Sequence, residues 1–308
     1  MRIFVAGATG VLGRRVVPLL VGAGHTVTGI ARTPEKAAAL EAAGAAPATV
    51  DLFDPDAVRD AVAGHDAVVN IATHIPDLSK AMRPGAWTEN DRIRTEGSRN
   101  LVDAALAAQA TRFVQESLAF FYVDGGSDWV DEDAQLDVPA FAAAFQQAEK
   151  QVARFSSSGG AGVVLRFGLF YGSGTSHTRS QLKTARRGLS PFPGPRAAYQ
   201  SFLHIDDAAS AVVAALEVPA GVYNVVEDEP GTRQQLTQAV AAALGRRPGW
   251  SLPGLTRIGG AKTAYMARSL RVSNRAFRDV SGWKPAYPNP EAGWQQVVAA
   301  ERETTVSD

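Results

Sequence analysis

The chain contains 308 residues and no cysteine, and its 31 Lys+Arg balance its 31 Asp+Glu, so the formal net charge is zero. This length suggests one large domain or two interlocked ones with a substantial core. The absence of cysteine excludes small folds stapled by disulfides as well as thiol chemistry. The balanced charge lacks the electrostatic surface typical of proteins that bind nucleic acid or anionic membranes. We therefore expect a globular protein that binds neither nucleic acid nor membranes.

The apolar stretches are too short to cross a membrane. The longest, such as Ala208 to Leu216, fall short of the roughly 20 residues that a spanning helix needs. The N-terminus has the pattern of a strand rather than that of a secretory leader. We therefore expect a cytoplasmic location.

Up to about Gly172, short apolar runs alternate with alanine-rich amphipathic segments, which is the pattern of a parallel sheet covered by helices. Pro34 and Pro55 each follow a Thr or Asp that can cap a helix. The pattern predicts an α/β protein with a doubly wound Rossmann sheet and helices on both faces. We predict strands at Arg2 to Ala6, Thr26 to Ala31, Ala48 to Asp51, Ala67 to Ile71, Arg112 to Glu116 and Gly162 to Arg166, and helices at Val11 to Val21, Pro34 to Ala42, Pro55 to Ala63, Glu89 to Ala108 and Ala140 to Phe155.

After Gly172 the alternation stops, and the proline-rich segment Ser190 to Arg196 predicts a loop. We divide the chain into a nucleotide-binding domain over residues 1–172, to which 200–226 return, and a smaller interleaved substrate-binding subdomain over 173–308. The later elements are predicted as strands at Phe202 to Ile205 and Gly221 to Val226, and as helices at Asp206 to Leu216, Thr232 to Leu244 and Pro290 to Glu301.

The first predicted strand leads directly into Gly7-Ala8-Thr9-Gly10-Val11-Leu12-Gly13, and a helix follows. A pyrophosphate at a helix N-terminus requires one glycine for the turn, one for close backbone approach and one for packing of the helix on the strand. The position between strand and helix, at the head of a series of βαβ units, is the context that supports this interpretation. We therefore predict a dinucleotide site at this turn, formed by Gly7, Thr9, Gly10, Val11, Leu12 and Gly13.

The end of the second predicted strand discriminates between the two nicotinamide dinucleotides. An Asp or Glu there binds the ribose hydroxyls of NAD, but this chain has Arg32. A cation favours the 2′-phosphate of NADP(H), and Arg14 lies close enough in the sequence to reach the same phosphate. The alternatives are that Arg32 is a solvated residue at a strand end and that Arg14 is an exposed helix residue.

Further motifs extend over nearly the whole chain. Together with the glycine turn they resemble the extended short-chain dehydrogenase/reductase family, which includes NAD-dependent epimerases and dehydratases. The resemblance implies that Asp51 and Leu52 hold the adenine, that Ile71, Ala72 and Thr73 line the ribose and diphosphate, and that Gly168 and Leu169 border the nicotinamide. The motifs are Asp51-Leu52, Asn70 to Thr73, Gly97 to Leu101, Leu165 to Gly172, Phe202 to Asp207, Tyr223-Asn224-Val225 and Gly282 to Pro285.

The family's catalytic pattern is absent. The resemblance implies a Ser or Thr after the fifth strand and Tyr-x-x-x-Lys on the next helix, with the tyrosine as general acid or base. If Glu149 is the acidic residue that the family places four positions after the lysine, Phe145 stands at the lysine position and Phe141 at the tyrosine position. The strand carries Leu118 at the hydroxyl position, with Ser117 one place earlier. Arg94 stands where the family tends to have Asn.

The remaining polar candidates are Ser117, which donates to a substrate oxygen or simply closes its strand, and His74, which donates a proton or is only solvated. No metal site is expected from the spacing of His, Asp and Glu. A wall of large apolar side chains near the expected nicotinamide favours a flat aromatic substrate, unless these side chains are ordinary core. They are Met82, Trp87, Phe120, Phe121, Phe141 and Phe145.

These observations favour an NADPH-dependent ketoreductase that acts on an aromatic or polyketide-type ketone without a tyrosine proton donor, similar to the triad-lacking ketoreductases of antibiotic pathways. A missing general acid costs about 3 to 5 kcal/mol of barrier, whereas correct positioning of the reactants supplies about 7 to 11 kcal/mol. A non-catalytic NADP(H)-binding redox regulator is the alternative, and a sugar-nucleotide epimerase or dehydratase is the third hypothesis. The protein is expected as a monomer or a homodimer.

Overall fold

A computed structural model describes residues 1–76, 83, 85–251 and 264–307 of the chain. The chain divides into two compact units. Unit 1 comprises Met1–Ser117, Ala140–Arg166 and Ala208–Tyr223, and unit 2 comprises Leu118–Pro139, Phe167–Asp207 and Asn224–Asp308. Among the described residues, no helix is both long and apolar enough to cross a membrane.

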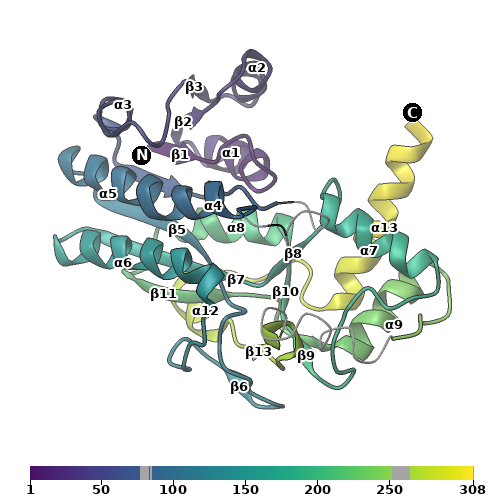
Figure 1. The fold of residues 1–308 in the computed structure, drawn as a ribbon. Helices are drawn as coiled ribbons and strands as arrows, with labels where there is room; N and C mark the ends of the chain where they lie inside the picture. The colour runs from purple at the N-terminus through teal and green to yellow at the C-terminus, as the bar shows by residue number, and fades with distance from the viewer. Residues whose placement is uncertain (77–82, 84, 252–263, 308) are drawn as a thin grey trace. The chain divides into compact units, whose positions relative to one another are not determined.

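A seven-stranded parallel sheet runs through unit 1 in the order β11-β7-β5-β4-β1-β2-β3 (Figure 1). In its middle, β1 pairs in parallel with β2 on one side and with β4 on the other. From β1 the chain first adds strands on one side of the sheet, β2 and β3, and then on the other side, from β4 to β11. This strand order confirms the predicted doubly wound Rossmann fold. The strands are β1 (Arg2–Ala6), β2 (Thr26–Ile30), β3 (Ala46–Ala48), β4 (Ala67–Asn70), β5 (Arg112–Leu118), β7 (Ala161–Phe167) and β11 (Gly221–Val225).

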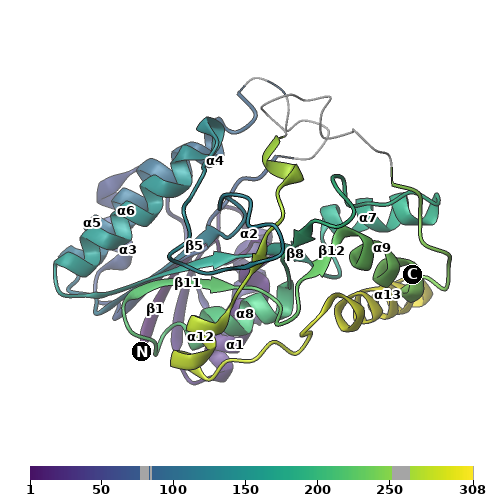
Figure 2. The same ribbon diagram turned by 90° about the horizontal axis from the view of Figure 1, so that it is seen from below.

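Helices cover both faces of the sheet: α3, α5 and α6 lie on one face, and α1 and α8 on the other (Figures 1 and 2). Thr33 and Asp54 cap α2 and α3, as the sequence predicted, and proline occupies the first turn of each helix. These helices are α1 (Gly13–Gly22), α2 (Pro34–Ala42), α3 (Pro55–Val62), α4 (Thr88–Arg92), α5 (Ser98–Ala107), α6 (Ala143–Ser157) and α8 (Ile205–Ala214).

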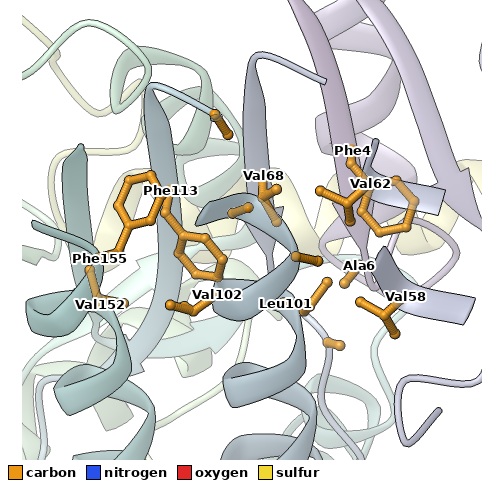
Figure 3. Packing of buried hydrophobic residues seen from close by; sticks show 14 of the residues in the cluster. Phe4, Ala6, Val58, Val62, Val68, Leu101, Val102, Phe113, Val152 and Phe155 are labelled. Atoms are coloured by element: carbon orange, nitrogen blue, oxygen red, sulfur yellow. The ribbon is translucent and has the colours of Figure 1, made fainter. Parts of the chain in front are cut away.

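An apolar core fills the space between the sheet and the face formed by α3, α5 and α6 (Figure 3). Phe4 and Phe113 project from the strands, while Leu101 and Phe155 approach from the helices, and all four are fully buried. The rings of Phe113 and Phe155 lie 5.7 Å apart, so α6 is packed directly on β5. This packing fixes the carboxyl ends of the strands, where the candidate site lies.

Two predicted elements differ from the structure. The third strand was predicted at residues 48–51 but lies at Ala46–Ala48, because Asp51 accepts a hydrogen bond from the backbone N–H of Phe53 and belongs to a turn. The long helix predicted from residue 89 to 108 consists of α4, a π-helical turn (Ile93–Gly97) and α5. The π-helical turn contains the buried Arg94, and such turns are frequent at functional sites.

Unit 2 has its own core around Tyr171, Phe202 and Trp294, each of which is at most 1% exposed. Residues 190–196 form the predicted loop without regular structure. The helices α7 and α12 were not predicted from the sequence. The elements of this unit are β6 (Trp129–Val130), β8 (Leu169–Tyr171), β9 (Tyr199–Gln200), β10 (Phe202–His204), β12 (Gly231–Thr232), β13 (Arg271–Val272), α7 (Ser176–Arg186), α9 (Arg233–Ala243), α12 (Arg275–Ser281) and α13 (Pro290–Ser307).

Candidate cofactor and active site

The glycine turn between β1 and α1 has the geometry of a dinucleotide cradle. Gly7 has φ +88°, and a Cβ there would lie 2.6 Å from the backbone of Ile71, which directly follows the neighbouring strand β4. A Cβ at Gly13 would lie 2.1 Å from the carbonyl oxygen of Gly7, so this glycine permits the close packing of helix and strand. At Gly10 a Cβ would meet a single atom, the Gly7 oxygen at 3.2 Å, which leaves its outer side open.

The start of α1 is available for an anion. Among the described residues, no side chain caps this helix, whose N-cap residue is Leu12. The amides of Gly10, Arg14 and Arg15 donate to backbone carbonyls of the turn, and the positive end of the helix dipole favours a negative group at this position. Val11 is an exposed apolar residue beside this end, and Thr9 is half-buried in the turn. These residues fit the diphosphate of a dinucleotide.

Parallel pairing brings the carboxyl ends of β1, β2 and β4 together. Arg32 follows β2 with a side chain that is 65% exposed, and the exposed Arg14 lies in the first turn of α1. Asp51 is exposed, and the carbonyl oxygen of Leu52 accepts a hydrogen bond from Asn100 at 2.9 Å. The residues predicted to hold the adenosine half of the dinucleotide thus lie near the carboxyl ends of neighbouring parallel strands.

Beyond β4, the chain passes from buried residues to exposed ones. Ile71 and Ala72 are buried, whereas Thr73 and His74 are exposed. The backbone N–H of His74 donates to the side chain of the fully buried Asn90, which ties this segment to α4. His74 Nε2 lies 3.8 Å from Glu89 Oε2.

Phe145 lies under a buried arginine. The guanidinium carbon of Arg94 is 3.6 Å from the centre of the Phe145 ring, and Arg94 Nη2 donates to Glu116 Oε2 at 2.7 Å. Burial lowers the pKa of Arg94, and the neighbouring charge of Glu116 opposes that shift. Phe145 is therefore part of a packed, charged core, which favours the alternative that this ring is structural.

Phe141 is half-buried at the entrance to α6, and its ring centre lies 6.1 Å from that of Trp87. These two rings form an aromatic surface within unit 1. Of the other residues predicted to line a substrate pocket, Met82 lies outside the described part of the chain. Phe120 and Phe121 belong to unit 2, where their ring centres are 4.7 Å apart, as do Gly168 and Leu169.

Ser117 is 2% exposed, and its hydroxyl donates to Glu149 Oε1 at 2.6 Å. The same carboxylate accepts two hydrogen bonds from Arg166, at 2.9 and 2.7 Å. This geometry favours the interpretation that Ser117 closes its strand and supports an ion pair.

Sequence reasoning missed the two buried ion pairs, Arg94–Glu116 and Arg166–Glu149. Arg94 differs from the family pattern, and Glu149 served only to find which residues of α6 stand at the family's tyrosine and lysine positions. The available signal was the occurrence of two arginines and two glutamates in predicted strands and helices that pack on the sheet, because buried charges are nearly always paired.

Comparison with known proteins agrees with this geometry. Residues 3–226 match the NAD dependent epimerase/dehydratase family. A 3-diazoavenalumate denitrifying reductase from a Streptomyces species is 36% identical over 94% of this chain and 97% of its own length. The 2-alkyl-3-oxoalkanoate reductase of Stenotrophomonas maltophilia is 30% identical over 86% of this chain and 80% of its own.

A solved structure shares the fold. The human epimerase family protein SDR39U1, crystallised with NADPH, superimposes with a TM-score of 0.77 at 24% identity, and the match covers 97% of this chain and 99% of that one. The family match covers most of the chain, and the two relatives described above are named reductases. This chain is therefore an oxidoreductase that belongs to the NAD-dependent epimerase/dehydratase family.

Proposed function

We propose that the protein is an NADPH-dependent reductase of an aromatic small molecule and that it reduces a ketone without a tyrosine proton donor. The observation that carries this proposal is the pair of phenylalanines at the start of α6, Phe141 and Phe145. In the whole sequence, none of the six tyrosines is followed by a lysine at the fourth position. When bound, NADPH supplies the hydride.

The chain's own contribution is to bind and orient. The backbone of Gly7, Gly10 and Gly13 admits the diphosphate to the N-terminus of α1, and Arg32 pairs with the 2′-phosphate. Positioning of this kind supplies about 7 to 11 kcal/mol, more than the roughly 3 to 5 kcal/mol lost with a general acid. A ketone whose oxygen is already hydrogen-bonded within the substrate needs the least help from the protein.

The aromatic surface formed by Phe141 and Trp87 supports a flat substrate. Aromatic side chains stack on planar rings and exclude water from the reacting group. A 2-alkyl-3-oxoalkanoate reductase among the similar proteins also acts on a 3-oxo group, according to its name. Epimerisation is disfavoured because it starts with the oxidation of an alcohol, for which a phenyl ring is no base.

The test is to incubate the purified protein with NADPH and a panel of aromatic ketones, and to follow the loss of NADPH absorbance and the masses of the products. The proposal predicts one alcohol formed per NADPH consumed. Reduction of none of the ketones, together with conversion of a sugar nucleotide, would instead support an epimerase.

A second candidate is the reduction of an aromatic diazo compound, favoured by the 36% identity to a 3-diazoavenalumate denitrifying reductase. In this reaction an aryl diazonium ion accepts a hydride, the hydrogen of which ends on the ring carbon, and the two nitrogens leave as N2, so that a C–H bond replaces the C–N bond. No alkoxide develops, and no tyrosine is needed to protonate one. An aromatic diazo compound added to the same panel tests this candidate, because only this reaction releases N2.

A further inference from the structure

We infer that Glu89 on α4 limits the preference of this site for NADPH over NADH, by placing a carboxylate beside the arginine that would bind the 2′-phosphate. Glu89 Oε1 lies 4.0 Å from Arg32 Nη1. The inference rests on the proposed NADPH binding and adds a residue that sets cofactor specificity.

Glu89 lies between two groups that come from different strands. While its Oε1 faces Arg32 after β2, its Oε2 lies 3.8 Å from His74 Nε2 after β4. The neighbouring Asn90 is fully buried and bonded to the backbone of His74, which holds α4 near the ends of these strands. The carboxylate is therefore placed by the fold, although the Glu89 side chain itself is 46% exposed.

The surroundings leave room for a ligand. Glu89, His74 and Phe53 line an open hollow of about 520 Å³ in unit 1. The guanidinium of Arg92 covers the Phe53 ring at 3.8 Å and pairs with Glu96 at 2.9 Å. The charge of Arg92, which also lines the hollow, is thus already matched by Glu96, whereas Arg32 lies beside the carboxylate of Glu89.

The electrostatic consequence depends on the cofactor. A 2′-phosphate is attracted by Arg32 but repelled by the carboxylate of Glu89. A 2′-hydroxyl gains from a nearby carboxylate, since Asp or Glu at this ribose is the usual acceptor for NAD. Glu89 therefore weakens the binding of NADPH and favours that of NADH. Removal of its carboxylate raises the ratio of the affinity for NADPH to the affinity for NADH.

The experiment measures dissociation constants of NADPH and NADH by fluorescence titration, without any substrate. The variant is Glu89→Gln, and the matched control is Glu96→Gln, which removes the same charge from a carboxylate paired with Arg92. We expect Glu89→Gln to raise the preference for NADPH about fivefold, the size typical of an exposed charge pair, and Glu96→Gln to leave it unchanged. High salt should reduce the effect.

An unchanged affinity ratio in Glu89→Gln, or an equal change in both variants, overturns the inference while the proposed function stands. If the unmodified protein binds neither dinucleotide, both proposals fail. Similar thermal unfolding midpoints for the two variants and the unmodified protein exclude misfolding as the cause of any change.

Discussion

Both units contain fully or largely buried carboxylates, but their surroundings differ. In unit 1, Glu116 and Glu149 each lie 2.7 Å from an arginine. In unit 2, Glu227 is 1% exposed, and neither of its oxygens has a hydrogen-bond partner among the described residues. The two regions show the two ways in which a protein interior accommodates an acid.

The difference has a physical consequence for protonation. Burial raises the pKa of Glu227 well above its ordinary value, and the charge of Asp207 adds to this shift. The backbone of Phe202 opposes this rise in the pKa of Glu227, although it makes no hydrogen bond to either carboxylate oxygen of Glu227. The paired acids of unit 1 form ion pairs, whereas burial without a cationic partner favours the neutral form of Glu227.

The largest effect is expected from breaking a pair in unit 1. Arg94→Met removes the cation and leaves the Glu116 charge buried, which should lower the free energy of unfolding by about 3–5 kcal/mol. Urea denaturation of the unmodified protein and the variant measures this loss.

The matched control is the double variant Arg94→Met/Glu116→Gln, which removes both charges. It should recover most of the lost stability, because the cost arises from an unpaired charge rather than from the missing side chain. A double variant as unstable as Arg94→Met alone would show that the arginine acts mainly through its packing on Phe145.

The next effect concerns the unpaired acid. The raised folded-state pKa of Glu227 stabilises the protein fully below the unfolded-state pKa near 4.5, and this contribution is lost as the pH rises. Glu227→Gln cannot ionise, so it should equal the unmodified protein near pH 4.5 and exceed it by about 1–3 kcal/mol at pH 8.

Thermal and urea unfolding across this pH range measure the difference between the two proteins. Glu229→Gln, at an exposed position on the same segment, serves as the control for the loss of one negative charge. A difference that does not grow with pH would contradict the account of Glu227 as a neutral buried acid.

The smallest effect is expected at Ser117. Ser117→Ala removes one hydrogen bond to Glu149, which still keeps both bonds from Arg166, so the loss should be about 1 kcal/mol. Turnover with a ketone substrate should remain nearly unchanged. A fall in kcat of a hundredfold or more with unaltered stability would instead place Ser117 in contact with the substrate.

Local signals predicted much of the fold. The helix over residues 34–42 was predicted with the observed bounds because Thr33 and Pro34 define its start. The glycine turn was predicted from the spacing of its three glycines between a strand and a helix. In the structure, a Cβ at Gly7 or Gly13 would collide with backbone atoms, and a Cβ at Gly10 would meet only the carbonyl oxygen of Gly7.

Contacts between distant segments could not be predicted in this way. Arg94 and Glu116 are 22 residues apart and Ser117 and Glu149 are 32 apart, so their pairing depends on the packing of three elements. The π-helical turn that carries Arg94 interrupts a sequence with an unbroken helical pattern. The isolation of Glu227 likewise follows from its three-dimensional surroundings rather than from its neighbours in the sequence.

The most direct test of the proposed hydride transfer uses NADPH deuterated at the transferable nicotinamide position. We predict deuterium on the carbinol carbon of a reduced aromatic ketone with the unmodified protein and with Ser117→Ala. Gly10→Val should abolish transfer, because its side chain enters the open side of the glycine turn. Tight NADPH binding without deuterium transfer to any ketone, and without N2 release from any diazo compound, would contradict a reductase and favour a redox-sensing regulator.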